Sequence, residues 1–233
     1  NCEGTPVMFM PITQGGHDHV YPDITLTYRG NNQISSAATT FTHASAALGT
    51  ANIDRSIAVS VLSNNSSVTL NSVTIAGISA VKVADADGVN RIKSIWLAAV
   101  PTGTTGSIVC TYSGNQDQNH VAWYELHGAS ATLEDTALGP GSGNVSITID
   151  VADGGAVIGA IMPLGSSSTP SCIWNGLTEH FDFQGRAAPY YIAITGASAA
   201  FATGETGKTI TATLSAAAHP TDFVFASFKP GRP

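Results

Sequence analysis

The chain has 233 residues, of which 43% are hydrophobic and only 11% charged, and its formal net charge is −7. This balance excludes an intrinsically disordered chain, because disorder goes with low hydrophobicity and high charge. The nine Lys and Arg residues form no basic run, which argues against nucleic-acid binding, and no apolar stretch reaches the roughly 18 residues of a membrane span, so we expect no membrane insertion.

Residues 1–22 differ from the rest of the chain, because they contain Pro-bounded apolar clusters without strand-like alternation. Four consecutive apolar residues, Val7, Met8, Phe9 and Met10, are unfavourable in water. We therefore interpret residues 1–22 as an N-terminal arm that lies across a neighbouring subunit or folds back on its own sheet.

The arm also contains the best metal-binding pattern of the chain, "GGHDHVYPD". His17 and His19 are two residues apart, so on an extended chain both imidazoles project to the same side. Zinc sites usually need four ligands, and only folding could bring His43 or His180 to this pair. The alternative is that both histidines are solvated or hydrogen-bonded, and we expect no cofactor.

The segment from Ser35 to Gly49 is rich in Ala but also in Thr and Ser, so a short helix and a strand followed by a loop are both open. The remainder is dominated by runs of five to eight residues with period-two alternation, bounded by Gly, Pro, Asn or Ser. Such runs are "DITLTYRG", "SIAVSVLS", "SIWLAAVP", "GSIVCTYSG", "HVAWYELHG", "NVSITIDVA", "GAVIGAIMP", "TITATLSA" and "DFVFASFKP".

These runs predict an all-β fold, an antiparallel jelly-roll-like β-sandwich over residues 23–233. Residues 55–128 align with residues 153–231 in element order and turn position, with Gly77 opposite Gly176. We interpret this as a degenerate internal duplication. The alternative is a chance alignment, since any alternating β protein aligns with itself somewhere.

The segment "DADGVN" matches the start of an EF-hand loop at Asp85 and Asp87. The twelfth position, which should be Glu, is Leu97 in a predicted strand, so the EF-hand interpretation fails. A looser calcium site and an ion-free Asp-Gly hairpin turn both remain open.

Three cysteines at wide spacing, Cys2, Cys110 and Cys172, form no disulfide framework. We interpret Cys110 and Cys172 as small buried hydrophobic residues, with a bridge between them as the less favoured alternative.

No pattern of a nucleophilic enzyme is present, and we expect no enzymatic activity. A glycosidase needs two carboxyl groups at a set separation, which spacing in sequence does not establish for the acidic residues Glu125, Asp150, Glu179 and Asp182.

Aromatic residues make up only 7% of the chain, and core packing is the preferred interpretation for its three Trp residues. A carbohydrate-binding face would use exposed aromatics, for which Trp174, beside Asn175 and Gly176, is the best candidate. The loop "DFQGRAAPYY" adds Arg186, Tyr190 and Tyr191.

The pattern "VTIAGISAVKV … IWLAAVPTGTTGSIVCTYSG … HVAWYELHG", together with "WNGLTE" and "FVFASFKP", resembles virion proteins of tailed bacteriophages. The resemblance spans Ile24 to Pro230 in outline, and most of its matching motifs are residues typical of turns. It implies a structural or adhesive role as a head decoration, fibre or tail-associated protein, and it implies no catalytic residues.

We therefore expect a non-enzymatic virion structural protein, located on the virion surface, that assembles through its arm and contacts other virion subunits or copies of itself. Attachment to a host-surface glycan is a further expected role. The alternative function is a lectin-like carbohydrate-binding module, assisted by calcium at Asp85 and Asp87.

Overall fold

The computed structural model describes residues 21–64, 67–86, 91–141, 143–165, 168–186, 191–215 and 218–231. These ranges contain seventeen β-strands and no helix. All strand pairs within these ranges are antiparallel. The predicted all-β fold is confirmed.

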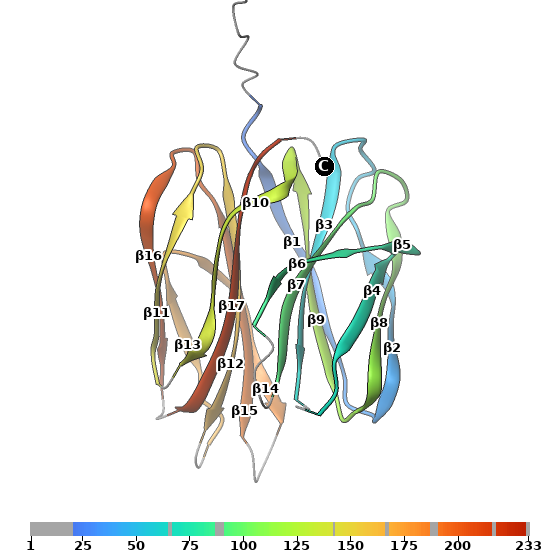
Figure 1. The fold of residues 1–233 in the computed structure, drawn as a ribbon, viewed down its shortest axis with the longest axis vertical. Helices are drawn as coiled ribbons and strands as arrows, with labels where there is room; N and C mark the ends of the chain where they lie inside the picture. The colour runs from blue at the N-terminus through green and yellow to red at the C-terminus, as the bar shows by residue number, and fades with distance from the viewer. Residues whose placement is uncertain are drawn as a thin grey trace, which may run out of the picture.

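The first half of the chain forms one β-sandwich, at the right in Figure 1. Its inner sheet has the order β1-β9-β3-β7-β6 and its outer sheet the order β2-β8-β4-β5. The bounds are β1 (Thr25–Ile34), β2 (Ala38–Ala47), β3 (Arg55–Ser63), β4 (Leu70–Ile75), β5 (Ile78–Ser79), β6 (Val81–Asp85), β7 (Ile92–Ala99), β8 (Thr105–Gln116) and β9 (Asn119–His127).

The second half forms another β-sandwich beside the first. Its inner sheet has the order β10-β17-β12-β15-β14 and its outer sheet the order β11-β16-β13. The bounds are β10 (Ala129–Gly141), β11 (Val145–Val151), β12 (Ala156–Gly165), β13 (Cys172–Asn175), β14 (Thr178–Arg186), β15 (Ile192–Ala200), β16 (Glu205–Leu214) and β17 (Ala218–Pro230).

Apart from the short strand β5, which has no counterpart, the two strand orders are the same once β1–β4 are matched with β10–β13 and β6–β9 with β14–β17. In each half the first strand pairs with the last, the second with the next to last, and the third with the strand before that. This nested pairing is a jelly roll, so each half is a complete one. The predicted duplication therefore extends beyond residues 55–128 and 153–231, because each unit also includes the two strands that precede those ranges.

The turns of the two halves also match. Gly77, between β4 and β5, and Gly176, between β13 and β14, have φ values of +80° and +91°. A side chain at such a φ value is strained, which explains why both turns carry glycine. Here the alignment of the two residues in sequence corresponds to a shared backbone conformation.

Three hydrophobic clusters fill the spaces between the four layers of Figure 1. Ile57 and Val59 of β3 face the core of the first jelly roll, whereas Ala58 and Leu62 of the same strand face a central cluster shared by both inner sheets. Strands β3 and β12 are therefore buried on both faces, which explains why β12 has no polar side chain and why, apart from Arg55, the polar residues of β3 are small serines.

The ambiguous segment at residues 35–49 is mainly strand β2, with Phe41 and His43 buried. Alternate residues of β2 point into the first jelly-roll core and out to solvent, so the strand interpretation was correct. The helical alternative is wrong because Thr and Ser occupy the outward positions, where they suit a strand surface.

Candidate functional site

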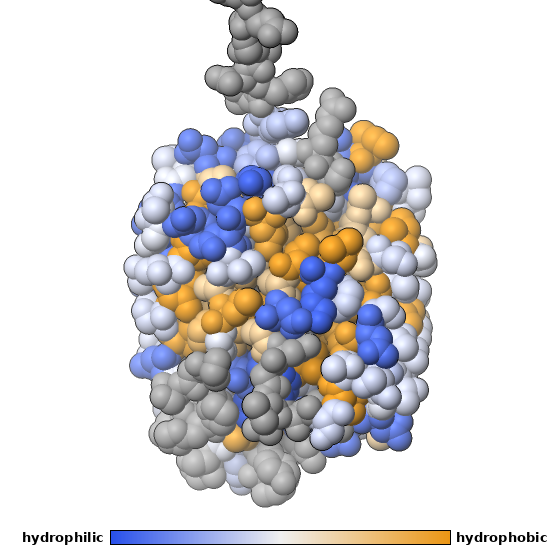
Figure 2. Space-filling model, in the orientation of Figure 1, coloured by the Kyte–Doolittle hydropathy of each residue, from blue (hydrophilic) through white to orange (hydrophobic). Residues whose placement is uncertain are grey.

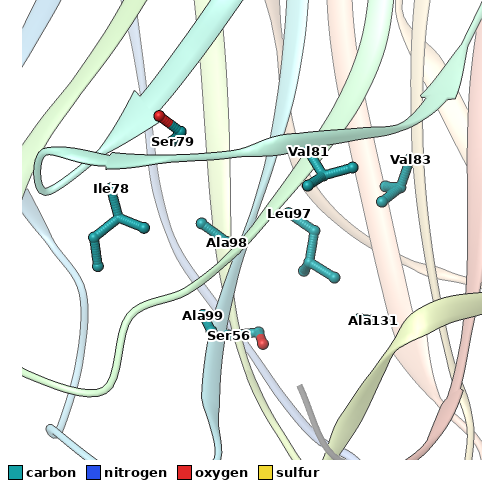
Figure 3. Close-up of a pocket in the computed structure, with 9 residues that line it drawn as sticks. All are labelled: Ser56, Ile78, Ser79, Val81, Val83, Leu97, Ala98, Ala99 and Ala131. Carbon is teal, nitrogen blue, oxygen red and sulfur yellow. The ribbon is translucent and has the colours of Figure 1, made fainter.

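An apolar groove lies where the two jelly rolls meet. It has a volume of about 370 Å³ and lies between the β5–β6 segment and the start of β10. Figure 3 shows the side chains of Val81 and Val83 projecting from β6 towards Leu97 of β7, with Ala131 of β10 on the opposite side of the groove from Ile78. The other lining residues are Ser56, Ile78, Ser79, Ala98 and Ala99.

The groove exists because two sheet edges lie side by side. Strand β6 pairs only with β7, and β10 pairs only with β17, so each is an edge strand of its inner sheet. A second hollow of about 540 Å³ continues the groove along β10 from Ala131 to Thr136. Exposed edges are surfaces onto which another chain can pair or pack.

Large apolar side chains at the groove are exposed to solvent. Val81 is 68% exposed and Ile78 38% exposed. Figure 2 shows hydrophobic surface across the middle of this face of the molecule. In addition, the buried hydroxyl of Ser56, which lines the groove, has no hydrogen-bond partner within the described ranges. An apolar hollow with exposed rims is typical of an interaction surface.

The opposite seam between the jelly rolls is closed by aromatic rings. Tyr28 of β1 stacks on His180 of β14, with ring centroids 4.6 Å apart. His120 of β9 lies between Phe181 and Phe183 of β14, with both centroid separations at 5.1 Å. The members of these ring contacts are roughly 60 to 150 residues apart in the sequence, so spacing along the chain gave no signal of them.

Ionic groups tie the two halves together at a second place. Asp222 of β17 accepts a hydrogen bond of 3.0 Å from Nη1 of Arg91, and its other oxygen lies 3.4 Å from Nζ of Lys93. Arg91 also donates to the carbonyl oxygen of Met162 in β12. All three charged side chains are buried, and such a group is favourable only when charge and hydrogen bonds are matched.

Arg55 holds one end of the first jelly roll. Its fully buried guanidinium donates to five backbone carbonyl oxygens in the β2–β3 and β7–β8 loops, at 2.7 to 3.3 Å. The acceptors are Leu48, Gly49, Val100, Thr102 and Gly103. Arg55 therefore has a structural role, because its guanidinium N–H groups donate to backbone carbonyl oxygens of the two loops.

The predicted metal ligands fall in different parts of the chain. His17, His19 and Asp87 lie outside the described residues. Asp85 ends strand β6, where its carboxylate accepts a hydrogen bond from the ammonium group of Lys82. Among the residues that the structure describes, no three His, Cys, Asp or Glu side chains are placed to hold a metal ion.

The predicted glycan-binding aromatics do not form an exposed platform around Trp174. This side chain is buried, its Nε1 donates to Oγ1 of Thr195, and its ring packs edge-on against Phe225. The prediction of Trp174 as a carbohydrate contact is therefore wrong, because alternation on β13 turns it into the second core. Tyr191 is partly exposed, whereas Tyr190 and the side chain of Arg186 lie outside what is described.

Cys110 and Cys172 are both buried and both free. Cys110 belongs to the core of the first jelly roll and Cys172 to that of the second, so the alternative of a bridge between them is wrong. Burial raises the pKa of each thiol to about 12, which keeps both in the unreactive protonated form. Cys2 lies outside the described residues.

The four carboxylates considered for glycoside hydrolysis have separate environments. Glu125 is buried and accepts hydrogen bonds from Nε and Nη2 of Arg29. Asp150 of β11 accepts a hydrogen bond from the backbone N–H of Gly207 in β16. Glu179 and Asp182 lie near each other on β14, where burial, and then the charge of Asp182, raises the pKa of Glu179.

The predicted arm residues Val7, Met8, Phe9 and Met10 lie outside the described residues. The chain is described from Tyr21 onward, and the backbone N–H of Ile24 donates to the carbonyl oxygen of Gly154 at 2.7 Å. Since Ile24 is buried in the central cluster, the arm is joined to the molecule at the junction of the two jelly rolls.

Comparisons with protein-family models, with curated proteins and with solved structures find no match. Among the residues described, no helix has the length and apolar character that a membrane crossing needs.

Proposed function

We propose that this chain is a non-enzymatic virion structural protein, of the decoration, fibre or tail-associated type, that assembles through its N-terminal arm. The resemblance of its strand and turn sequences to virion proteins of tailed bacteriophages supports the virion setting. The assembly role is supported by the architecture and by the sequence of the arm.

The observation that carries the proposal is the attachment of an apolar arm to a rigid double sandwich. Ile24 is fixed at the junction by burial and by its bond to Gly154, while residues 7–12 (VMFMPI) carry no charge. Burying apolar side chains against a partner is favourable by about 25 cal/mol per Å². An apolar segment joined to a preformed domain is therefore suited to subunit contacts.

Removal of residues 1–20 tests this proposal, because it leaves the anchor at Ile24 in place. We expect the full chain to sediment as species heavier than its 23.8 kDa, and the shortened chain to sediment as a monomer. Circular dichroism should show the same β-sheet signal for both. A monomeric full chain, or a shortened chain that associates normally, would contradict the assembly role.

The virion setting is tested separately, by mass spectrometry of particles purified in a density gradient. Peptides of this chain should copurify with the particles. Absence of these peptides from the particles would contradict the virion setting, whatever the result for assembly.

A further inference from the structure

The two jelly rolls contact each other as the subunits of a twofold dimer do. Strand β1 of the first contacts β14 of the second, and the matching strand β10 contacts β6, the counterpart of β14. A twofold contact uses the same patches on both partners. The molecule therefore has two equivalent seams, one between β1 and β14 and one between β10 and β6.

Strand register shows which positions of the two seams correspond. Trp123 of β9 pairs with Val59, and its counterpart Phe225 of β17 pairs with Gly159. The next residue along β9 is Tyr124, which pairs with Tyr28 of β1. The next residue along β17 is Ala226, which pairs with Thr136 of β10. Thr136 is therefore the counterpart of Tyr28.

The counterpart of His180 follows from a shared irregularity. The pairing of β14 with β15 shifts between Glu179 and Phe181, which leaves His180 at the bulge. The pairing of β6 with β7 shifts between Lys82 and Ala84, which leaves Val83 at the bulge. Val83 thus corresponds to His180.

The two seams differ in the size of these side chains. The stacked rings of Tyr28 and His180 correspond to Thr136 and Val83, which line the second seam. By the same register Phe181 corresponds to Ala84. The first seam is filled by these rings. Of the matching positions, Val83 lines both the apolar groove of about 370 Å³ and the hollow that continues it, whereas Thr136 lines the hollow alone. The ring positions of the first seam therefore correspond to the hollow and to the end of the groove at Val83, so the second seam is open where the first is filled.

We propose that Phe9 of a second copy of this chain, together with its apolar neighbours, occupies the groove between β6 and β10. This inference rests on the proposed assembly role and names the surface that the arm contacts. An aromatic side chain buries a large apolar area, so the ring of Phe9 would supply much of the buried area that the rings of the first seam provide and the second seam lacks. The edges of β6 and β10 offer main-chain groups to an extended segment.

The length of the arm allows it to reach a second copy of the chain. An ideal Cβ placed on Gly128 lies 3.6 Å from the carbonyl oxygen of Pro22, and Ala131 is three residues further on, at most about 11 Å away. The twelve residue steps from Phe9 to Tyr21 span up to about 40 Å when extended. Phe9 can therefore extend well beyond its own molecule and reach the groove of a neighbouring copy, as the proposed assembly role requires.

The experiment compares self-association of the full chain with that of three variants by sedimentation velocity. Phe9→Ser removes the ring, and Ala131→Phe fills the groove from within. The control Ile173→Phe adds the same ring at an exposed position, 71% accessible, on the outer strand β13. We expect the first two to weaken association about tenfold or more and the control to leave it unchanged.

A synthetic peptide of residues 5–13 provides a second measurement that does not depend on folding of Ala131→Phe. It should inhibit association of the unmodified chain, and the same peptide with Phe9→Ser should not. If removal of residues 1–20 abolishes association while Ala131→Phe and the peptide have no effect, the groove assignment is wrong and the assembly role stands. If Ile173→Phe weakens association as much as Ala131→Phe, the groove assignment is also wrong. If removal of residues 1–20 has no effect, the assembly role itself fails.

Discussion

Tyr28 and His180 stack across the junction of the two jelly rolls, with their rings 4.6 Å apart and within 10° of parallel. They are more than 150 residues apart in sequence, and each belongs to an edge strand of its inner sheet. His180 is oriented by a bond of 2.7 Å between its Nε2 and Oγ of Ser198. This pair closes one of two equivalent seams.

The stack should contribute a measurable coupling to stability. In a double-mutant cycle with Tyr28→Leu and His180→Leu, we expect a coupling free energy of about 1 kcal/mol, because ring pairs add roughly 0.5–1.5 kcal/mol beyond their buried area. Urea denaturation of the four proteins measures it. The matched cycle at the open seam, with Thr136→Ala and Val83→Ala, should give a coupling near zero. Equal couplings in the two cycles would contradict the difference between the seams.

Stability should fall in acid because of His120. Burial, and secondarily the nearby His43, lowers the pKa of this imidazole to about 3. The imidazole of His120 therefore binds a proton more readily in the unfolded chain than in the folded one. The contribution of His120 to the free energy of unfolding is constant above about pH 6.5 and falls by about 1.4 kcal/mol per pH unit between pH 6.5 and pH 3. The free energy of unfolding from pH 7 to pH 4 measures this loss.

The variant His120→Leu isolates the effect, because other titrating groups are common to both proteins. Glu179 and Asp182 have raised pKa values, mainly through burial, and they favour the folded state as the pH falls. At pH 4.5 the unmodified protein should have lost roughly 3 kcal/mol more than His120→Leu, relative to pH 7. Parallel pH profiles for the two proteins would show that His120 does not cause the loss.

Arg55 should be among the least replaceable residues outside the apolar cores. Arg55→Met leaves five carbonyl oxygens without this donor, those of Leu48 and Val100 in buried residues, and we expect a loss of about 3 kcal/mol in the free energy of unfolding. Arg55→Lys should restore little, because an ammonium group lacks the planar fork that reaches both loops. Urea denaturation of both variants is the measurement, and full stability of Arg55→Lys would contradict the assigned role.

The two core thiols should be inert in the folded protein. In a Cys2→Ser background, a thiol reagent such as DTNB should not react under native conditions, because both pKa values are raised to about 12 and both groups are buried. After unfolding in urea, two thiols per chain should react. Fewer than two would indicate a bridge and would contradict the placement of Cys110 and Cys172 in separate cores.

The sequence predicted the strands well, because alternation reports directly on the two faces of a half-buried strand. In β11, Val145, Ile147 and Ile149 are buried and the residues between them are not, as their spacing predicts. The equivalence of Gly77 and Gly176 in the two halves could also be predicted, because a turn with a positive φ value favours glycine at that position. These local signals were enough to predict the fold class and to indicate the repeat, which the matching strand orders then showed.

The seams were not predictable in the same way. Alternation shows that Tyr28 and His180 lie on buried or partly buried strands, but it does not say which face of one sheet meets which face of another. The bulges that place Val83 and His180 at matching positions depend on strand register, which no short sequence pattern fixes here. The same limit explains Trp174, where the neighbouring Gly turn suggested exposure and the pairing of β13 with β16 directs the ring inward.

The most direct test of arm-mediated assembly is cross-linking between two differently labelled chains. In a Cys2→Ser background, one chain carries Met10→Cys in the arm and the other carries Val81→Cys at the exposed rim of the groove. Treatment of the equimolar mixture with a short bismaleimide should yield a covalent dimer that contains one of each chain, as resolved by mass spectrometry. No mixed dimer, or cross-linking only within a chain that carries both substitutions, would contradict docking of the arm onto a neighbouring copy.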